Sequence, residues 1–232
     1  MISLSCATRS LTIRCLAAAA LFTGAAGAAS AAEPGGLPFP APGTYKLDRI
    51  QRVPFSIVRD GPGLPHLLST YTTGKITLLT FFYTLCTDPQ GCPLAWNAFE
   101  AVREKIKADP VLHGKARLVF FSFDPVHDNG ETLQFFAESY KADSAIIPWR
   151  FIGSWSNLFL EYTLRSFGQE ISTRRNASGG KRVVIEHLLK VFLIDPEGWV
   201  REIYTSAFLD PDVLINDIKT LQLDENKINL SN

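Results

Sequence analysis

Apolar residues in this chain occur in short runs that alternate with amphipathic stretches. Residues 75–83 are β-branched and aromatic with little polarity, a pattern that predicts a strand buried on both faces. Residues 93–108 follow after a short loop, and their apolar positions recur at near-helical spacing, which predicts a helix. Pro93 suits the first turn of this helix because its missing N–H would have no partner there. These residues therefore predict a strand–loop–helix unit.

The same alternation continues toward the C-terminus. It predicts strands over residues 117–123 and 149–152, a weak strand at 54–58, helices over 131–140, 155–167 and 211–223, and an exposed hairpin tip at 172–182. Residues 188–194 and 199–204 flank the turn sequence Asp195-Pro-Glu-Gly198 and predict a β-hairpin. Strands joined by helices imply parallel pairing, and the hairpin adds antiparallel strands to the same sheet. We therefore predict the α/β class, with three layers (α/β/α), a mixed sheet and a C-terminal β-hairpin.

The first 31 residues have the layout of a secretory signal peptide. Arg9 and Arg14 precede a short apolar stretch, and small residues of the A-x-A type end at Ala31. The apolar stretch is shorter than the roughly 20 residues of a membrane-spanning helix, so we expect cleavage and no stable membrane anchor. The predicted organisation is a signal peptide at 1–31, an extended arm at 32–50 and one domain at 51–232 in a soluble periplasmic protein.

Charge and cysteine content further restrict the classes of function that the chain can have. The chain has 23 basic and 23 acidic residues, and losing the two arginines of the signal peptide leaves a net charge of about −2. No basic block occurs, so we expect no nucleic-acid partner. Cys6 and Cys15 lie in the predicted signal peptide, which leaves Cys86 and Cys92 in the exported protein. In an oxidising compartment such a pair either forms a disulfide or is kept reduced for a purpose.

Topology brings a third residue toward this pair. Parallel α/β sheets bind ligands beyond the carboxyl ends of their strands, and Cys86 and Cys92 follow the strand at 75–83. His187 directly precedes the strand predicted at 188–194. If that strand runs antiparallel to the central one, its start lies beside the same strand ends. We therefore expect Cys86, Cys92 and His187 to converge.

Such a set supports two kinds of chemistry. Thiolates with an imidazole suit copper, above all Cu(I), whereas two thiols alone can carry out disulfide exchange. The N-terminus of the helix at Pro93 is expected to lower the pKa of Cys92, with Cys86 as a second candidate. A structural disulfide is the third possibility, although closing a loop of seven residues removes little chain entropy.

Other ionisable residues are weaker candidates. His127 follows the strand at 117–123 and is either a supporting group near the site or a solvated side chain, while His66 and His113 are expected on the surface. Asp88 precedes a proline, and this context predicts a turn residue. Asp124 and Asp128 form a carboxylate pair that would suit acid–base work or a hard metal, but their Asp-Pro context favours turn and helix-cap roles. The thiol pair is therefore the stronger candidate.

From Pro54 to Leu223 the chain resembles the Sco (SenC/PrrC-like) family of thioredoxin-fold copper proteins. The landmarks are Cys86…Cys92-Pro93, the segment 121–128, the segment 151–153, and His187 ahead of 191–198. The resemblance implies a thioredoxin-like fold and copper, as Cu(I) or Cu(II), bound by Cys86, Cys92 and His187. It also implies a client cuproprotein, such as the copper-bearing subunit of cytochrome c oxidase, whose copper centre is assembled by copper delivery, thiol reduction or both.

One departure from the family concerns the loop between the cysteines. Family members usually have C-x-x-x-C, whereas this chain has five residues between Cys86 and Cys92. Ordering two more residues costs about 1–2 kcal/mol each before compensation. The leading hypothesis is a copper metallochaperone rather than an enzyme. The alternatives are a thiol–disulfide oxidoreductase that uses the Cys86/Cys92 pair to reduce a partner's cysteines, and a binding module with a structural disulfide.

Overall fold

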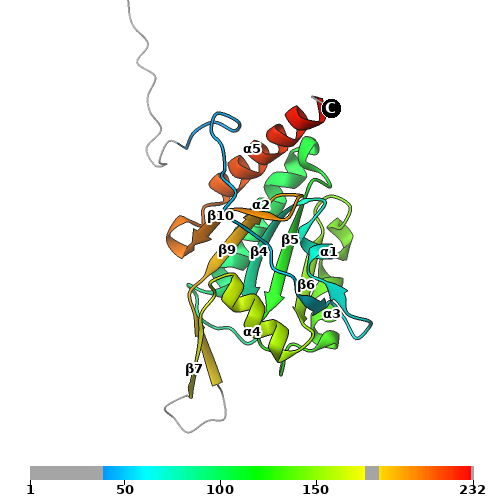
Figure 1. Ribbon diagram of the computed structural model, residues 1–232, viewed down its shortest axis with the longest axis vertical. Helices are drawn as coiled ribbons and strands as arrows, with labels where there is room; N and C mark the ends of the chain where they lie inside the picture. Colours follow the sequence, from blue (N-terminus) through cyan, green and yellow to red (C-terminus); the bar gives the residue numbers. More distant parts are fainter. Residues whose placement is uncertain (1–38, 176–182, 231–232) are drawn as a thin grey trace, which may run out of the picture. The chain divides into compact units, whose positions relative to one another are not determined.

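Four strands form the buried centre of the fold in the computed structural model, which describes residues 39–175 and 183–230 (Figure 1). They are β4 (Ile76–Phe82), β5 (Ala116–Ser122), β6 (Trp149–Ser154) and β9 (Lys190–Ile194). β4, β5 and β6 run parallel, whereas β9 pairs antiparallel with β4. Every residue of β4 and β5 is buried, as the apolar runs predict.

Shorter strands extend this sheet on both sides. They are β1 (Gln51–Arg52), β2 (Ile57–Arg59), β3 (His66–Leu67) and β10 (Trp199–Thr205). The strand order is β1-β10-β9-β4-β5-β6-β2-β3, with β9 and β10 forming the predicted antiparallel hairpin. The sheet is therefore mixed.

Helices cover both faces of the sheet (Figure 1). The helices are α1 (Ser69–Thr72), α2 (Cys92–Ala108), α3 (Gly130–Ser139), α4 (Asn157–Ser166) and α5 (Pro211–Leu230), with short 3-10 turns at Pro110–Leu112, Lys141–Asp143 and Ser206–Phe208. α4 packs on one face, and α2, α3 and α5 lie on the other. α5 continues past the predicted end at 223 because residues 224–230 contain no glycine or proline.

Aromatic side chains sort the core into two halves. Because successive residues of a strand face opposite sides of the sheet, Phe81 and Phe82 point into different layers. Phe81 packs against Phe121 and Phe167 with ring centroids 5.3 and 5.4 Å apart, on the α4 side. Phe82 packs against Phe120 at 5.4 Å, on the side of α2 and α3. This second half of the core reaches the sheet end where the cysteines lie.

A separate two-stranded sheet corrects one prediction. β7 (Ile171–Arg175) and β8 (Val183–His187) pair antiparallel, with Ile171 opposite His187. Residues 172–175, predicted as part of an exposed tip, are therefore strand. The β-branched run of β8 gives the backbone of β7 a partner that the polar composition of 172–182 concealed. Residues 176–182 of the predicted tip lie outside the described residues.

The N-terminal arm is described from residue 39 onward. The Tyr45 hydroxyl donates a hydrogen bond to the carboxylate of Asp217 in α5. The backbone N–H of Gly43 donates to the Thr220 hydroxyl at 3.0 Å, and Leu47 is buried. This part of the arm is thereby attached to α5, while the signal peptide predicted at 1–31 lies outside the described residues.

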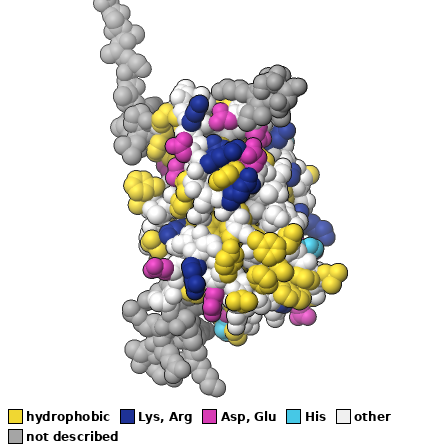
Figure 2. All heavy atoms as spheres, viewed as in Figure 1, with side chains coloured by type: hydrophobic (Ala, Val, Ile, Leu, Met, Phe, Trp, Pro, Cys, Tyr) yellow, Lys and Arg dark blue, Asp and Glu magenta, His cyan; other side chains and the backbone are white. Residues whose placement is uncertain are grey.

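Exposed apolar side chains gather over the surface formed by β2, β3 and α4 (Figure 2). Phe55 is 63% exposed and Leu158 is 75% exposed there, and the Phe55 ring lies edge-on to Phe159 at 6.3 Å. Among residues 39–175 and 183–230, none of the helices combines the length and apolarity needed to cross a membrane.

Candidate metal and thiol-redox site

The thiol pair lies where β4 ends and α2 begins. Residues 83–91 form the connecting loop with Cys86, and Cys92 is the first residue of α2. Because β9 is antiparallel to β4, with Thr80 opposite Val191, the chain enters β9 at the same sheet end. The structure places Cys92 Sγ 4.0 Å from His187 Nε2. Two of the three predicted residues thus meet across 95 positions of sequence.

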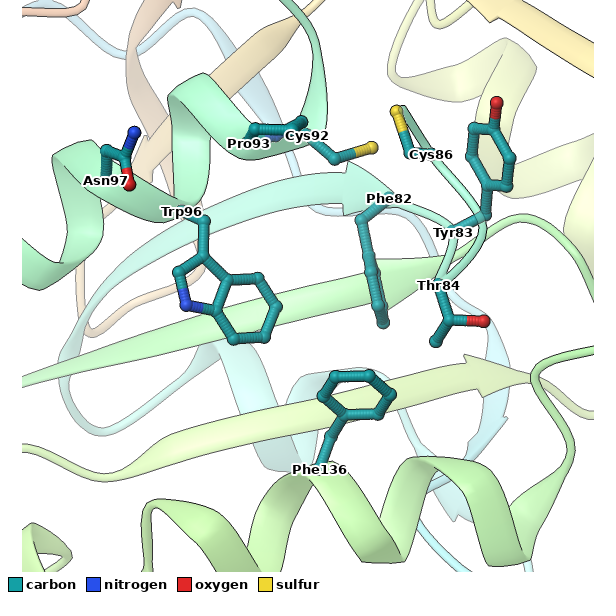
Figure 3. A pocket seen from close by; sticks show the side chains of 9 residues that line it. All are labelled: Phe82, Tyr83, Thr84, Cys86, Cys92, Pro93, Trp96, Asn97 and Phe136. Carbon is teal, nitrogen blue, oxygen red and sulfur yellow. The ribbon is translucent and has the colours of Figure 1, made fainter. Parts of the chain in front are cut away.

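The two sulfurs are free thiols that point toward each other (Figure 3). Cys92 is 5% exposed, and Cys86 is half-buried. The hydrogen bond that the Cys92 thiol donates to the Cys86 sulfur lowers the pKa of Cys86 to about 6, aided by backbone N–H groups and the Tyr83 hydroxyl and opposed by burial. Cys86 is therefore largely a thiolate at neutral pH.

Cys92 shows the opposite behaviour, which corrects a prediction. Its hydrogen bond to Cys86, followed by burial, raises the pKa of Cys92, whereas the helix N-terminus was expected to lower it. The physical reason is that one proton is shared between two close sulfurs, and it stays on the sulfur with less access to water. The start of α2 still favours a thiolate, because the backbone N–H of Cys92 contributes to lowering the pKa of Cys86.

Hydrogen bonds fold the loop between the cysteines into turns. The Cys86 N–H donates to the carbonyl of Tyr83 at 3.1 Å. The Asp88 carboxylate accepts from the Gln90 N–H at 3.0 Å, and its carbonyl accepts from the Gly91 N–H at 3.0 Å. Asp88 therefore is the turn residue that its place before Pro89 predicts.

A buried carboxylate attaches this loop to the end of β5. Asp128, 2% exposed, accepts a hydrogen bond from the Thr84 N–H at 3.1 Å and another from the Thr84 hydroxyl. It also accepts from the Ser122 hydroxyl at 2.6 Å. Burial raises the pKa of Asp128, and the hydrogen bonds from Ser122 and Thr84 partly oppose that rise.

This contact corrects the turn or helix-cap role expected for Asp128. The side chain that caps α3 is Asn129, which accepts from the Thr132 N–H at 3.0 Å. Asp128 instead joins segments 44 positions apart. Its position after a strand at the same sheet end was the one available signal, the same signal that pointed to His187. Asp124 does form the expected turn, accepting from the Val126 N–H at 3.2 Å.

Aromatic rings hold the imidazole of His187. Its ring lies edge-on to Phe123 at 4.8 Å and to Tyr83 at 6.3 Å, and these two rings are 5.3 Å apart. Tyr83 and Phe123 were not predicted as site residues, because nothing in their spacing distinguishes them from core residues.

The other histidines have partners of their own. His127 Nδ1 lies 2.7 Å from the Asp124 carboxylate, and the His127 side chain is 55% exposed. His66 lies 3.6 Å from the Asp60 carboxylate, and a ring nitrogen of His113 is 3.1 Å from the carbonyl of Lys107. Within the described part of the chain, no group of three or more His, Cys, Asp and Glu side chains is assembled closely enough to hold a metal ion. Of the three predicted ligands, Cys92 contacts both of the others, Cys86 and His187.

A cavity of about 350 Å³ opens beside the sulfurs (Figure 3). Its lining comes from the end of β4, the loop and helices α2 and α3, and consists of Phe82, Tyr83, Thr84, Cys86, Cys92, Pro93, Trp96, Asn97 and Phe136. None of these side chains other than the thiols carries a charge at neutral pH. The thiol pair is therefore accessible from an apolar space.

Comparisons with known proteins agree with this architecture. The SCO1/SenC family model matches residues 66–222. A comparison with curated protein sequences finds no match.

Several solved structures share the fold. Copper-bound ScoI from Arabidopsis thaliana is 18% identical, with a TM-score of 0.62, and the match covers 75% of this chain and 99% of that one. Copper-bound ScoI from Bradyrhizobium japonicum is 19% identical, with a TM-score of 0.58 and coverages of 73% and 98%. BsSco, described as a cytochrome c oxidase assembly protein with a disulfide switch, is 24% identical, with a TM-score of 0.52 and coverages of 73% and 92%. The predicted thioredoxin-like α/β fold is thereby confirmed.

Proposed function

Because the chain belongs to the SCO1/SenC family, we propose that it is an exported copper-binding protein whose ligands are Cys86, Cys92 and His187. In this proposal it delivers copper to, or matures the copper site of, a respiratory oxidase such as cytochrome c oxidase. The observation that carries the proposal is the 4.0 Å approach of Cys92 Sγ to His187 Nε2, with the Cys86 sulfur hydrogen-bonded to that same Cys92.

The donor set fits copper. With metal–sulfur and metal–nitrogen bonds of about 2.3 and 2.0 Å, one ion spans a sulfur and a nitrogen up to about 4.3 Å apart. The observed separation of Cys92 Sγ and His187 Nε2 lies within that reach. Two sulfurs and one imidazole nitrogen are soft donors that favour copper over Mg²⁺ or Ca²⁺. Copper is here the cargo that the protein passes on.

The protonation states also suit loading near neutral pH. Cys86 already offers a thiolate, since its pKa is about 6. Cys92 keeps its proton until copper displaces it, because burial and the hydrogen bond to Cys86 raise the pKa of Cys92. Copper binding should therefore release about one proton at pH 8, and more below pH 6.

Competition with a chromogenic Cu(I) chelator under anaerobic conditions tests this proposal. Cys86→Ser and Cys92→Ser should each weaken Cu(I) binding by more than about 100-fold, and His187→Ala by about tenfold or more. His127→Ala is the matched control, because His127 follows the neighbouring strand but pairs with Asp124. Equal affinity in all four variants and the native protein would overturn the proposed site.

A second function is favoured by the unequal thiols. A half-buried Cys86 with a low pKa beside a buried Cys92 with a high pKa is the arrangement of an attacking and a resolving cysteine. Cys86 would attack a partner disulfide, and Cys92 would then displace the partner thiol and close the Cys86–Cys92 disulfide. Cys92→Ser should trap the mixed disulfide with the client, whereas Cys86→Ser should not. Absence of a trapped species in both variants would exclude this function.

A further inference from the structure

The cavity beside the thiol pair has a rigid aromatic floor. Phe82, Trp96 and Phe136 come from β4, α2 and α3 and lie together below the two sulfurs (Figure 3). The Trp96 ring packs on Phe136 at 5.9 Å, and its Nε1 donates a hydrogen bond to the Tyr140 hydroxyl at 2.8 Å. The floor is therefore held in place before any ligand arrives.

The polar groups of the lining do not favour a charged ligand. The Thr84 hydroxyl donates a hydrogen bond to Asp128, and the Trp96 Nε1–H donates to Tyr140. The other polar side chains of the lining besides the thiols are Tyr83 and Asn97, and both are uncharged. A small charged thiol compound such as glutathione, with two carboxylates and an ammonium group, would find no opposite charge there. An uncharged apolar group would displace water from the aromatic floor at no such cost.

Exposed apolar side chains also flank the residues that line the cavity. Leu85, which precedes Cys86 in the chain, is 56% exposed, and Phe135, which precedes Phe136, is 72% exposed. The Phe135 and Phe136 rings are 6.0 Å apart, so the exposed ring adjoins the floor. Large apolar side chains left in water next to a reactive sulfur are typical of a surface that a polypeptide covers.

We propose that this cavity binds one large apolar side chain of the client polypeptide, located within about two residues of the client cysteine that meets Cys86. This inference rests on the proposed function, because it assumes a client whose cysteine approaches the thiol pair. Consecutive residues are about 3.8 Å apart, so a side chain adjacent to that cysteine reaches the floor while the client sulfur contacts Cys86. The cavity thus selects which cysteines of a client are engaged.

Two short peptides and a small thiol test this selectivity. One peptide carries Leu next to its cysteine and the other carries Ser. Both are blocked at their ends, and both, like glutathione, are activated as 2-pyridyl disulfides. The protein is the full chain, reduced, with Cys6→Ser and Cys15→Ser so that only the thiol pair reacts.

The reaction is a two-electron exchange that is followed by absorbance. The Cys86 thiolate attacks the cysteine sulfur of the probe, the old S–S bond breaks, and pyridine-2-thione leaves. Cys92 then loses its proton to solvent and attacks the Cys86 sulfur, which releases the probe as a free thiol. The protein pair ends as a disulfide, and its two electrons have passed to the probe.

The Leu peptide should react about tenfold faster than the Ser peptide and the glutathione probe, since burying one such side chain is worth at least that factor. Phe136→Asp places a charge on the floor and should abolish the preference. Gln134→Asp, the same charge at an exposed position of α3, should retain it. Asn97→Trp fills the cavity from an exposed helix position and should also abolish the preference, even if Phe136→Asp fails to fold.

Three results would overturn the inference: equal rates for both peptides, a preference that survives Asn97→Trp or a folded Phe136→Asp, or no reaction with any probe. Cu(I) affinity, measured in the same variants, separates this inference from the proposed function. Asn97→Trp should leave that affinity near the native value, because Asn97 lies outside the proposed ligand set. Native affinity with no peptide preference refutes only the cavity. If the native chain does not bind Cu(I), the proposed metal site is refuted.

Discussion

Asp128 offers the sharpest test of how the thiol loop is positioned. Its buried carboxylate accepts hydrogen bonds from the Thr84 N–H, the Thr84 hydroxyl and the Ser122 hydroxyl. Asp128→Ala leaves these three donors without an acceptor. Since a buried orphaned donor costs about 1–3 kcal/mol, and water reaches part of the site, we expect the free energy of unfolding to fall by about 2–4 kcal/mol.

Asp128→Asn separates shape from charge. Asparagine keeps a carbonyl for the Thr84 N–H, and its amide donates to a hydroxyl, so the loss should be about 1 kcal/mol at pH 4. Burial raises the pKa of Asp128 in the folded protein. The stability that this group contributes is therefore complete below its ordinary pKa of about 3.9 and is lost as pH rises through its higher folded value.

The asparagine variant lacks this pH-dependent loss. The difference in stability between the native protein and Asp128→Asn should therefore shrink as pH rises from 4, near the ordinary pKa of an aspartate, to 8. Burial also raises the pKa of Glu225, but Glu225 is present in both proteins and cancels from the difference. Urea unfolding, monitored by circular dichroism at both pH values, measures this difference in stability. A difference that stays constant or grows with pH would refute the reasoning, as would Asp128→Ala within 0.5 kcal/mol of native, a threshold near the usual noise of surface substitutions.

Three further outcomes follow from the site and its supports. The rate of Cys86 alkylation by iodoacetamide should be half-maximal near pH 6, and Cys92→Ala should move that midpoint to higher pH because the hydrogen bond donated to Cys86 is lost. A midpoint that Cys92→Ala leaves unchanged would contradict the role of that hydrogen bond. Asp88→Ala should weaken Cu(I) binding by about tenfold in chelator competition while changing stability little, since the loop turn loosens at an exposed position; unchanged affinity would show that the turn is not needed. Asp217→Ala should lower the unfolding free energy by about 2–4 kcal/mol, because the Tyr45 and Tyr204 hydroxyls lose their acceptor. Lys219→Ala, on the same helix but with a partly exposed side chain, should cost less than 1 kcal/mol in the same urea titration.

The fold was predictable from the sequence because its signals are local. The residues of β4 and β5 are mostly apolar, and the amphipathic period of α2 is unbroken, so neither signal depends on distant partners. The approach of His187 to Cys92 was predictable from topology, because the direction of each strand determines which strand ends lie side by side. β7 was missed because its pairing depends on β8, and polar composition alone does not reveal a partner strand.

The charge distribution within the site was not predictable in this way. Both cysteines lie near the N-terminus of α2, and sequence alone does not tell which sulfur is buried. Burial of Cys92 decides that the proton stays there and the negative charge resides on Cys86. The contact of Asp128 with Thr84 and the meeting of Trp96 with Phe136 likewise depend on side-chain packing between elements far apart in sequence. The spacing of apolar residues along the sequence does not predict such contacts.

The length of the loop between the cysteines has a structural explanation. Ordering two additional residues was expected to cost about 1–2 kcal/mol each and so to weaken copper binding. Asp88 accepts hydrogen bonds from Gln90 and Gly91, and the Thr84 anchor to Asp128 fixes the start of the same loop. The loop is thereby ordered when the protein folds, so its entropy is not lost again when an ion binds. Its length therefore does not by itself argue for weak copper binding.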